Sequence, residues 1–180
     1  SITHIRVSPP PSAGLPALPS YPNLRWLGYL SATSVYGDHG GAWVDETTPC
    51  IPTSPRGAER LAAEQSWQRA YPQTHVFRLA GIYGPDRNVL DELRAGTARR
   101  IDKPGQFFSR IHVEDIALVL AASIAKPNPG VIYNVADNEP ASSAEVTAYG
   151  AQLLGLPTPP LEPYDPTRLS PMAASFYADN

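Results

Sequence analysis

The chain has 180 residues, of which 42% are hydrophobic and 17% are charged, so it fits one domain that can bury a core. Its formal net charge of −3 gives no sign of binding to nucleic acid or an anionic membrane. No apolar run approaches the roughly 18 residues of a membrane span, no signal-peptide pattern is recognised, and the single cysteine excludes an internal disulfide framework and a cysteine-rich zinc site. We therefore expect a cytoplasmic protein that has no metal site and acts on a small molecule.

The first half of the chain alternates extended and helical patterns. A helix over 55–70 is indicated by Thr53 or Ser54 as its cap, by Pro55 in its first turn and by Pro72 beyond its end. In chain order the patterns predict a strand at 3–8, a proline- and serine-rich loop at 9–23, a strand at 25–30, a glycine-rich loop at 37–41, that helix, and a strand at 74–80.

The second half continues the alternation. A helix at 113–126 has the clearest apolar periodicity, with Glu114 and Asp115 in its first turn and Pro127 after its end. The other predicted elements are a helix at 88–95 that Gly96 ends, a strand at 131–135, and a helix from Ser142 or Ser143 to about Leu154. Alternating strands and helices favour a parallel sheet covered by helices, and ligands bind such sheets beyond the carboxyl ends of the strands. Residues 8–10, 31–34 and 80–83 should therefore share one rim.

The segments at this rim resemble the second half of an extended short-chain dehydrogenase/reductase of the NAD-dependent epimerase/dehydratase type. Six blocks carry the resemblance in order: SATSVYG at 31–37, Glu46, PTSP at 52–55, RLAGIYGP at 78–85, IHVED at 111–115 and YNV at 133–135. The stretch YGDHGGAWVDE at 36–46 is similar to a less typical bacterial branch of that family.

The resemblance implies a Rossmann-like, doubly wound parallel α/β sheet whose N-terminal half is missing, so that the first three βα units would precede Ser1. Residues 1–180 would form this partial NAD(P)-binding domain, with a small substrate-side lobe at about 84–110 and 138–180. The family's Gly-rich loop, which holds the cofactor pyrophosphate, has no counterpart in this sequence. We therefore expect binding of NAD or NADP by this chain to be weak or absent.

The resemblance also implies which residues lie near a cofactor and a substrate. The expected cofactor contacts are Ser8, Pro9, Pro10, Ser31, Ala32, Leu79, Ala80, Gly81 and Ile82. Gly81 permits close approach of the backbone to a ligand. The expected substrate contacts are Tyr83 and His112, with Arg110 as an anion contact. The family's sugar-nucleotide-binding arginine would lie nearer Phe108, so the role of that arginine is not carried over to Arg110. For His112 the alternative of a helix-start residue that packs and bonds the backbone is favoured, because a lone histidine is weak evidence. Asp115 is expected to be a first-turn helix partner.

The family's catalytic Ser or Thr falls on Ala32, with Thr33 beside it, and its Tyr and Lys fall on Arg56 and Arg60. An arginine stays protonated, so it cannot exchange a proton in catalysis. One interpretation is that Arg56 and Arg60 form a cationic pair that holds a carboxylate or phosphate, with Thr33, Ser34 or Tyr36 supplying a hydroxyl. The alternative is a solvated helix face on which Glu59 and Glu64 pair with these arginines.

Three functional hypotheses remain open from the sequence. The first is an NAD(P)-dependent epimerase, dehydratase or reductase that acts on a nucleotide-sugar-like or other polar hydroxyl or carbonyl substrate. The second is a non-catalytic dinucleotide-binding protein that senses redox state. The third is that this chain alone is inactive, because half of the cofactor site is absent. An unpaired sheet edge also predicts that the chain dimerises, aggregates or needs a partner.

Overall fold

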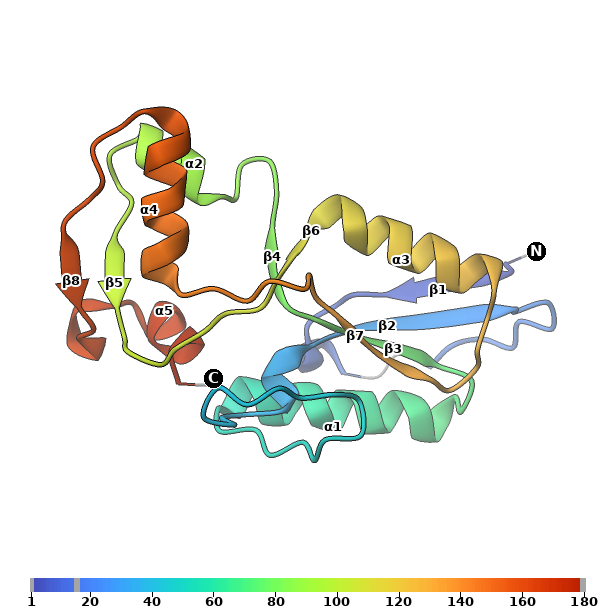
Figure 1. Cartoon of the computed structure of the whole chain (residues 1–180). Coiled ribbons are helices and arrows are strands. Elements are labelled where there is room, and N and C mark those ends of the chain that lie inside the picture. The colour runs from blue at the N-terminus through green and yellow to red at the C-terminus, as the bar shows by residue number, and fades with distance from the viewer. Residues whose placement is uncertain (1, 15–16, 179–180) are drawn as a thin grey trace.

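The structure is a computed structural model that describes residues 2–14 and 17–178. It is an α/β protein with a parallel four-stranded sheet and a smaller lobe beyond the carboxyl ends of its strands (Figure 1). The elements in chain order are β1 (His4–Val7), η1 (Pro11–Ala13), β2 (Trp26–Ala32), η2 (Thr33–Val35), α1 (Pro55–Ala70), β3 (His75–Leu79), β4 (Gly81–Tyr83), α2 (Val89–Arg94), β5 (Arg100–Asp102), β6 (Arg110–His112), α3 (Val113–Ala125), β7 (Ile132–Val135), α4 (Ser143–Leu154), β8 (Leu161–Pro163), η3 (Pro166–Arg168) and α5 (Pro171–Phe176).

The main sheet has the order β1-β2-β3-β7, and every neighbouring pair is parallel. The parallel α/β fold expected from the sequence is thereby confirmed. The register sets Val7 opposite Tyr29 and Ala32 opposite Leu79, so β2 continues beyond the end of β1. Strand β1 pairs only with β2, and its outer edge has no partner strand among the described residues.

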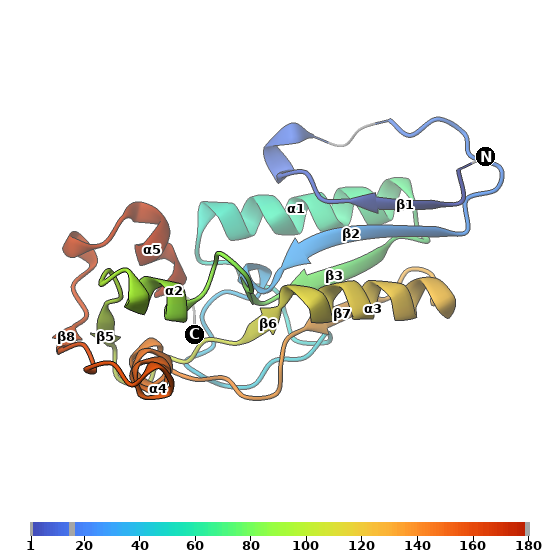
Figure 2. The same cartoon turned by 90° about the horizontal axis from the view of Figure 1, so that it is seen from above.

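Each face of the sheet is covered by one long helix, α1 on one side and α3 on the other (Figure 2). Successive residues of a strand point to opposite faces, and β2 shows this clearly. Leu27 and Tyr29 pack with Trp67 of α1, whereas Trp26 packs with Phe77 and Ile116 on the α3 side. Both cores are therefore built from alternate residues of the same strands.

The helix boundaries follow from capping. Ser54 accepts a hydrogen bond from the backbone N–H of Gly57 at the start of α1, as its sequence pattern predicts. Ser142 and Glu145 form a reciprocal capping box at the start of α4, and Gly155 ends that helix in the left-handed conformation. The residues that the sequence singled out as helix ends thus act as caps.

The segment between β1 and β2 differs from an ordinary crossover. Two parallel strands are usually joined through a helix that covers the sheet, but the described part of this connection contains only the short turn η1. The expected proline-rich loop therefore takes the place of a crossover helix, and its described part lies beside α1. The lobe consists of α2, α4, β5, β8 and α5, and the chain passes between the sheet and the lobe through β4, β6 and residues 136–141 (Figure 1). We call these three crossings the neck.

Candidate functional site

The candidate site lies where β1, β2 and β3 end and face the lobe (Figure 1). The residues after β1, Ser8, Pro9 and Pro10, are exposed, as is Gly81, the first residue of β4. Parallel strands place their carboxyl ends at one edge, and this edge is where open α/β sheets bind ligands. The expectation that these segments share a rim is met by the strand order.

Two hydroxyl groups are presented at the end of β2. Thr33 and Ser34 form the short turn η2, and both are partly exposed. Neither side chain has a hydrogen-bond partner among the described residues. The turn is held tightly against α1, because a Cβ at Gly57 would lie 2.4 Å from the carbonyl oxygen of Ser34. Ala32 precedes the turn and has no polar side chain, so hydroxyl chemistry at this strand end falls to Thr33 and Ser34.

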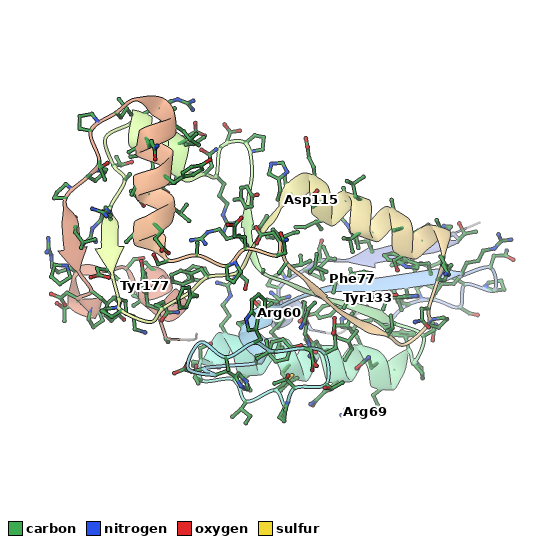
Figure 3. The ribbon with its side chains drawn as sticks, in the orientation of Figure 1. Arg60, Arg69, Phe77, Asp115, Tyr133 and Tyr177 are labelled. Carbon is green, nitrogen blue, oxygen red and sulfur yellow. The ribbon has the colours of Figure 1, made fainter. Side chains whose placement is uncertain are left out.

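The two arginines of α1 are held differently. The Nη1 of Arg60 donates to the hydroxyl of Tyr29 and to the carbonyl oxygen of Leu30, at 3.2 Å each. Figure 3 places Arg60 between α1 and the end of the sheet. Arg56 is exposed, and its guanidinium has no partner in the described part of the chain. The cationic pair therefore has one fixed member, Arg60, at the strand ends.

The alternative of a solvated helix face holds for Arg56 and Glu59, which are both exposed, but its ion pairs are not formed: neither Glu59 nor Glu64 pairs with Arg56 or Arg60 within residues 2–14 and 17–178. Glu64 is 1% exposed and forms a salt bridge with Arg78 of β3, with Nη2 of Arg78 2.9 Å from Oε2 of Glu64. Glu64 lies on the face of α1 that packs against the sheet. Its partner is on a neighbouring strand, and local spacing along the helix could not predict that partner.

Tyr36 belongs to the same buried network. Its hydroxyl donates to Oδ1 of Asn134 at 2.7 Å and accepts from Nη1 of Arg78 at 2.9 Å. Ser31 donates from its hydroxyl to the carboxylate of Glu64. Burial raises the pKa of Tyr36, although the hydrogen bond from Arg78 opposes it. The expected catalytic role of Tyr36 and cofactor role of Ser31 therefore compete with structural bonds that occupy both hydroxyls.

The end of β3 is mostly core. Leu79 and Ala80 are buried, and Ile82 is partly buried. The close backbone approach that Gly81 permits is to β6, because a Cβ at Gly81 would lie 3.3 Å from the carbonyl oxygen of Ser109. Among the cofactor contacts implied by the resemblance, the exposed ones are thus Gly81 and the residues after β1.

The three expected substrate contacts meet at the neck. Tyr83 is 38% exposed and contacts His112 edge to face, with ring centroids 5.1 Å apart. His112 caps α3, since its Nδ1 accepts from the backbone N–H of Glu114 at 3.3 Å. The reading of His112 as a helix-start residue that bonds the backbone is confirmed. Arg110 lies in β6, two residues before this cap.

A pocket of about 360 Å³ opens beside the end of β1, between the proline-rich loop and α1. Its lining includes Pro9 and Pro10 of the loop, Tyr29 of β2, and Glu59 and Trp67 of α1. A dinucleotide needs open backbone along several strand ends, and the exposed residues after β1 and β3 fit that need. The described residues have no Gly-rich turn between a strand and a helix, so they do not fit the pyrophosphate.

Residues 2–14 and 17–178 contain no group of three or more His, Cys, Asp or Glu side chains that could hold a metal ion. Within the same residues, no helix is long and apolar enough to cross a membrane.

The chain is similar in sequence to known proteins. No family model matches the chain. It is 34% identical over 148 residues to Protein YeeZ of Escherichia coli K12, which covers 73% of the chain and 47% of that protein. It is 27% identical over 138 residues to dTDP-D-glucose 4,6-dehydratase of Mus musculus, covering 70% of the chain and 39% of that protein. The chain thus spans about half the length of the curated relatives it matches, or less.

Solved structures give the same picture. A conserved protein of unknown function from Silicibacter pomeroyi superimposes with a TM-score of 0.83 and 60% identity, over 88% of this chain and 57% of that one. The dTDP-glucose 4,6-dehydratase of Bacillus anthracis in complex with NAD superimposes with a TM-score of 0.68 and 22% identity, over 81% of this chain and 51% of that one. The resemblance drawn from the sequence is confirmed: this chain is related to members of the NAD-dependent epimerase/dehydratase family, and it spans part of their length.

Proposed function

We propose that this chain contributes the substrate side of an NAD(P)-dependent epimerase, dehydratase or reductase that acts on a nucleotide-sugar-like or other polar hydroxyl or carbonyl substrate. The observation that carries the proposal is the free Thr33–Ser34 hydroxyl pair at the end of β2, beside the fixed guanidinium of Arg60. Such a pair can hold a substrate oxygen while a nearby cation stabilises negative charge on it.

The bound nicotinamide would take up and return a hydride. The residues of this chain would position the substrate, because Arg60 remains protonated and cannot act as a base. Tyr36 is also unsuited to that role, since burial raises its pKa and its hydroxyl is committed to Arg78 and Asn134. Proton transfer would therefore fall to Thr33, Ser34, water or the substrate itself.

A second candidate is a non-catalytic, redox-sensing dinucleotide-binding protein in the cytoplasm. It is favoured by the arginines at positions 56 and 60, which replace the family's proton-transferring tyrosine and its lysine. The outer edge of β1 has no partner strand among the described residues. Under both proposals, a strand from another copy of the chain or from another segment would pair with this edge.

Titration of NADH and NADPH against tryptophan fluorescence separates these ideas, with this chain and a protein extended to the length of its relatives. We expect no tight binding to this chain, because it has no pyrophosphate site, and a micromolar Kd would contradict this. For the extended protein, hydride exchange with a panel of nucleotide sugars indicates an enzyme. Cofactor binding without exchange indicates a sensor, and no cofactor binding rejects both.

A further inference from the structure

Arg110 at the neck is a partly buried cation without an ionic partner. Its Nη1 donates to the carbonyl oxygens of Phe108 and Ala141, at 2.9 Å each. Both acceptors are neutral backbone groups. Within residues 2–14 and 17–178, no carboxylate oxygen lies within 4.0 Å of its guanidinium, whereas Arg78 and Arg99 each have such a partner.

The rest of the guanidinium reaches solvent. No hydrogen bond from Nε or Nη2 of Arg110 to a described residue is formed. Because no buried polar side-chain atom among those residues lacks a partner, these two atoms are accessible. The Nε–Nη2 edge of a guanidinium is a planar fork that matches two oxygens of one carboxylate or phosphate.

The surroundings favour a bound anion over a solvated cation. The guanidinium carbon of Arg110 lies 5.7 Å from the centroid of the Phe108 ring, and Phe108 packs edge to face on Tyr177. Burial lowers the pKa of Arg110, and the charges of Asp137, Tyr177 and Tyr83 oppose this without cancelling it. A charge that is partly removed from water and bonded only to neutral groups costs free energy, which a bound anion would recover.

The neck gathers these groups from distant parts of the chain. Tyr83 ends β4, Arg110 begins β6, Asp137 follows β7 and Tyr177 follows α5. Asp137 is tied to the neck backbone, since its N–H donates to the carbonyl oxygen of Arg110 at 2.7 Å and its Oδ1 accepts from the N–H of Glu139 at 3.3 Å. Tyr177 lies in the lobe, at the end of α5 (Figure 3).

We infer that the Nε–Nη2 edge of Arg110 binds one anionic group, a phosphate monoester or a carboxylate, between the sheet and the lobe. Its assignment to the substrate of the enzyme rests on the proposed function, whereas the anion site itself does not. A substrate that enters the crevice with such a group would be held at the neck, while its reacting carbon lies toward the end of β2.

The test is an NMR titration of the ¹⁵N-labelled chain with sodium phosphate and, separately, with sodium acetate, at constant ionic strength and neutral pH. The arginine Nε–Hε signals are followed, and Arg110→Lys assigns the relevant signal. We expect the Arg110 signal to shift to saturation with at least one anion. Preference for phosphate or acetate identifies the class. A shift that does not saturate with either anion would overturn the inference.

Two variants sharpen this result. Arg110→Lys keeps the charge but lacks the fork, so it should weaken anion binding by about tenfold. Arg87→Lys changes an exposed arginine between β4 and α2 and should leave the affinity unchanged. Equal affinities of Arg110→Lys and the unaltered chain would contradict the assignment, and circular dichroism checks that Arg110→Lys is folded. If it is not, saturation confined to the Arg110 signal of the unaltered chain decides. The titration contains no dinucleotide. A failure of the anion-binding inference therefore does not affect the hydride-exchange test of the proposed function, and a failure of that test does not affect the anion-binding inference.

Discussion

Glu64→Gln tests the buried network that joins α1 to the sheet. The carboxylate of Glu64 accepts from Nε and Nη2 of Arg78, at 2.9 to 3.3 Å, and from the hydroxyl of Ser31. Both charged side chains are almost fully buried, with exposed fractions of 4% for Arg78 and 1% for Glu64. Burial alone lowers the pKa of Arg78, but the hydrogen bonds and charge of Glu64 outweigh it and raise that pKa above its ordinary value.

Glutamine has the size of glutamate, but it carries no charge and turns an amide donor toward a donor of Arg78 or Ser31. The guanidinium then stays buried without a counter-charge, because Tyr36 and the amide oxygen are its only remaining acceptors. Removing one partner of a buried ion pair costs about 3–5 kcal/mol. A domain of this size is stable by about 5–15 kcal/mol, so the variant should lose a large part of its stability.

Urea unfolding, followed by circular dichroism and by the fluorescence of Trp26 and Trp67, measures this loss. In thermal melts a loss of that size lowers Tm by at least about 6 °C for a chain of this length. Glu59→Gln is the matched control, because Glu59 is an exposed glutamate on the same helix, and its effect should stay within about 0.5 kcal/mol. A Glu64→Gln variant as stable as this control would refute the reasoning.

Two other positions make separate predictions. The Nδ1 of buried His75 forms a hydrogen bond with the carbonyl oxygen of Leu27, and its Nε2 accepts one from the N–H of Asn128. Burial lowers the pKa of His75 from its ordinary value of 6.5, and the hydrogen bond to Leu27 opposes this without cancelling it. The unfolded chain therefore binds the proton at a higher pH than the folded chain. The stabilisation is fully present above pH 6.5 and falls as the pH drops below it, by at most about 1.4 kcal/mol per pH unit. Urea unfolding across this range should show that slope, and a His75→Gln variant with the same slope would contradict the assignment. For Gly28→Ala, the new Cβ would lie 2.2 Å from Cη2 of Trp26, so urea unfolding should show a loss of about 1–3 kcal/mol, and a neutral result would mean that the indole moves freely.

Several elements were predictable because their signals are local. Strands β1, β2 and β3 and helices α1, α3 and α4 all appear within a few residues of their expected bounds. Ser54, Ser142 and Gly155 act as caps in the way that their residue types dictate. The short strands β4, β5, β6 and β8 and the helix α5 were not predicted, since strands of three residues carry too little pattern to be recognised without their partners.

The candidate site was predictable only as a location. The strand ends could be placed because alternating strands and helices imply a parallel sheet and a shared rim. The resemblance placed Arg60 near that rim, but its bonds to Tyr29 and Leu30 depend on how α1 packs. Trp43 shows the converse, because the large apolar indole of a tryptophan is usually buried and this one is 79% exposed.

The sequence by itself determined the fold class, the long elements and the rim, since hydrophobic periodicity, caps and prolines act over a few residues. Only the tertiary structure decided which polar groups are committed and which are free. It paired Glu64 with Arg78, took Tyr36 and Ser31 into the core, and left Arg110 with neutral partners at the neck. Apart from the bond between Arg110 and Phe108, these outcomes depend on contacts between residues from 14 to 98 positions apart, and no local pattern encodes which distant charge a buried side chain will meet.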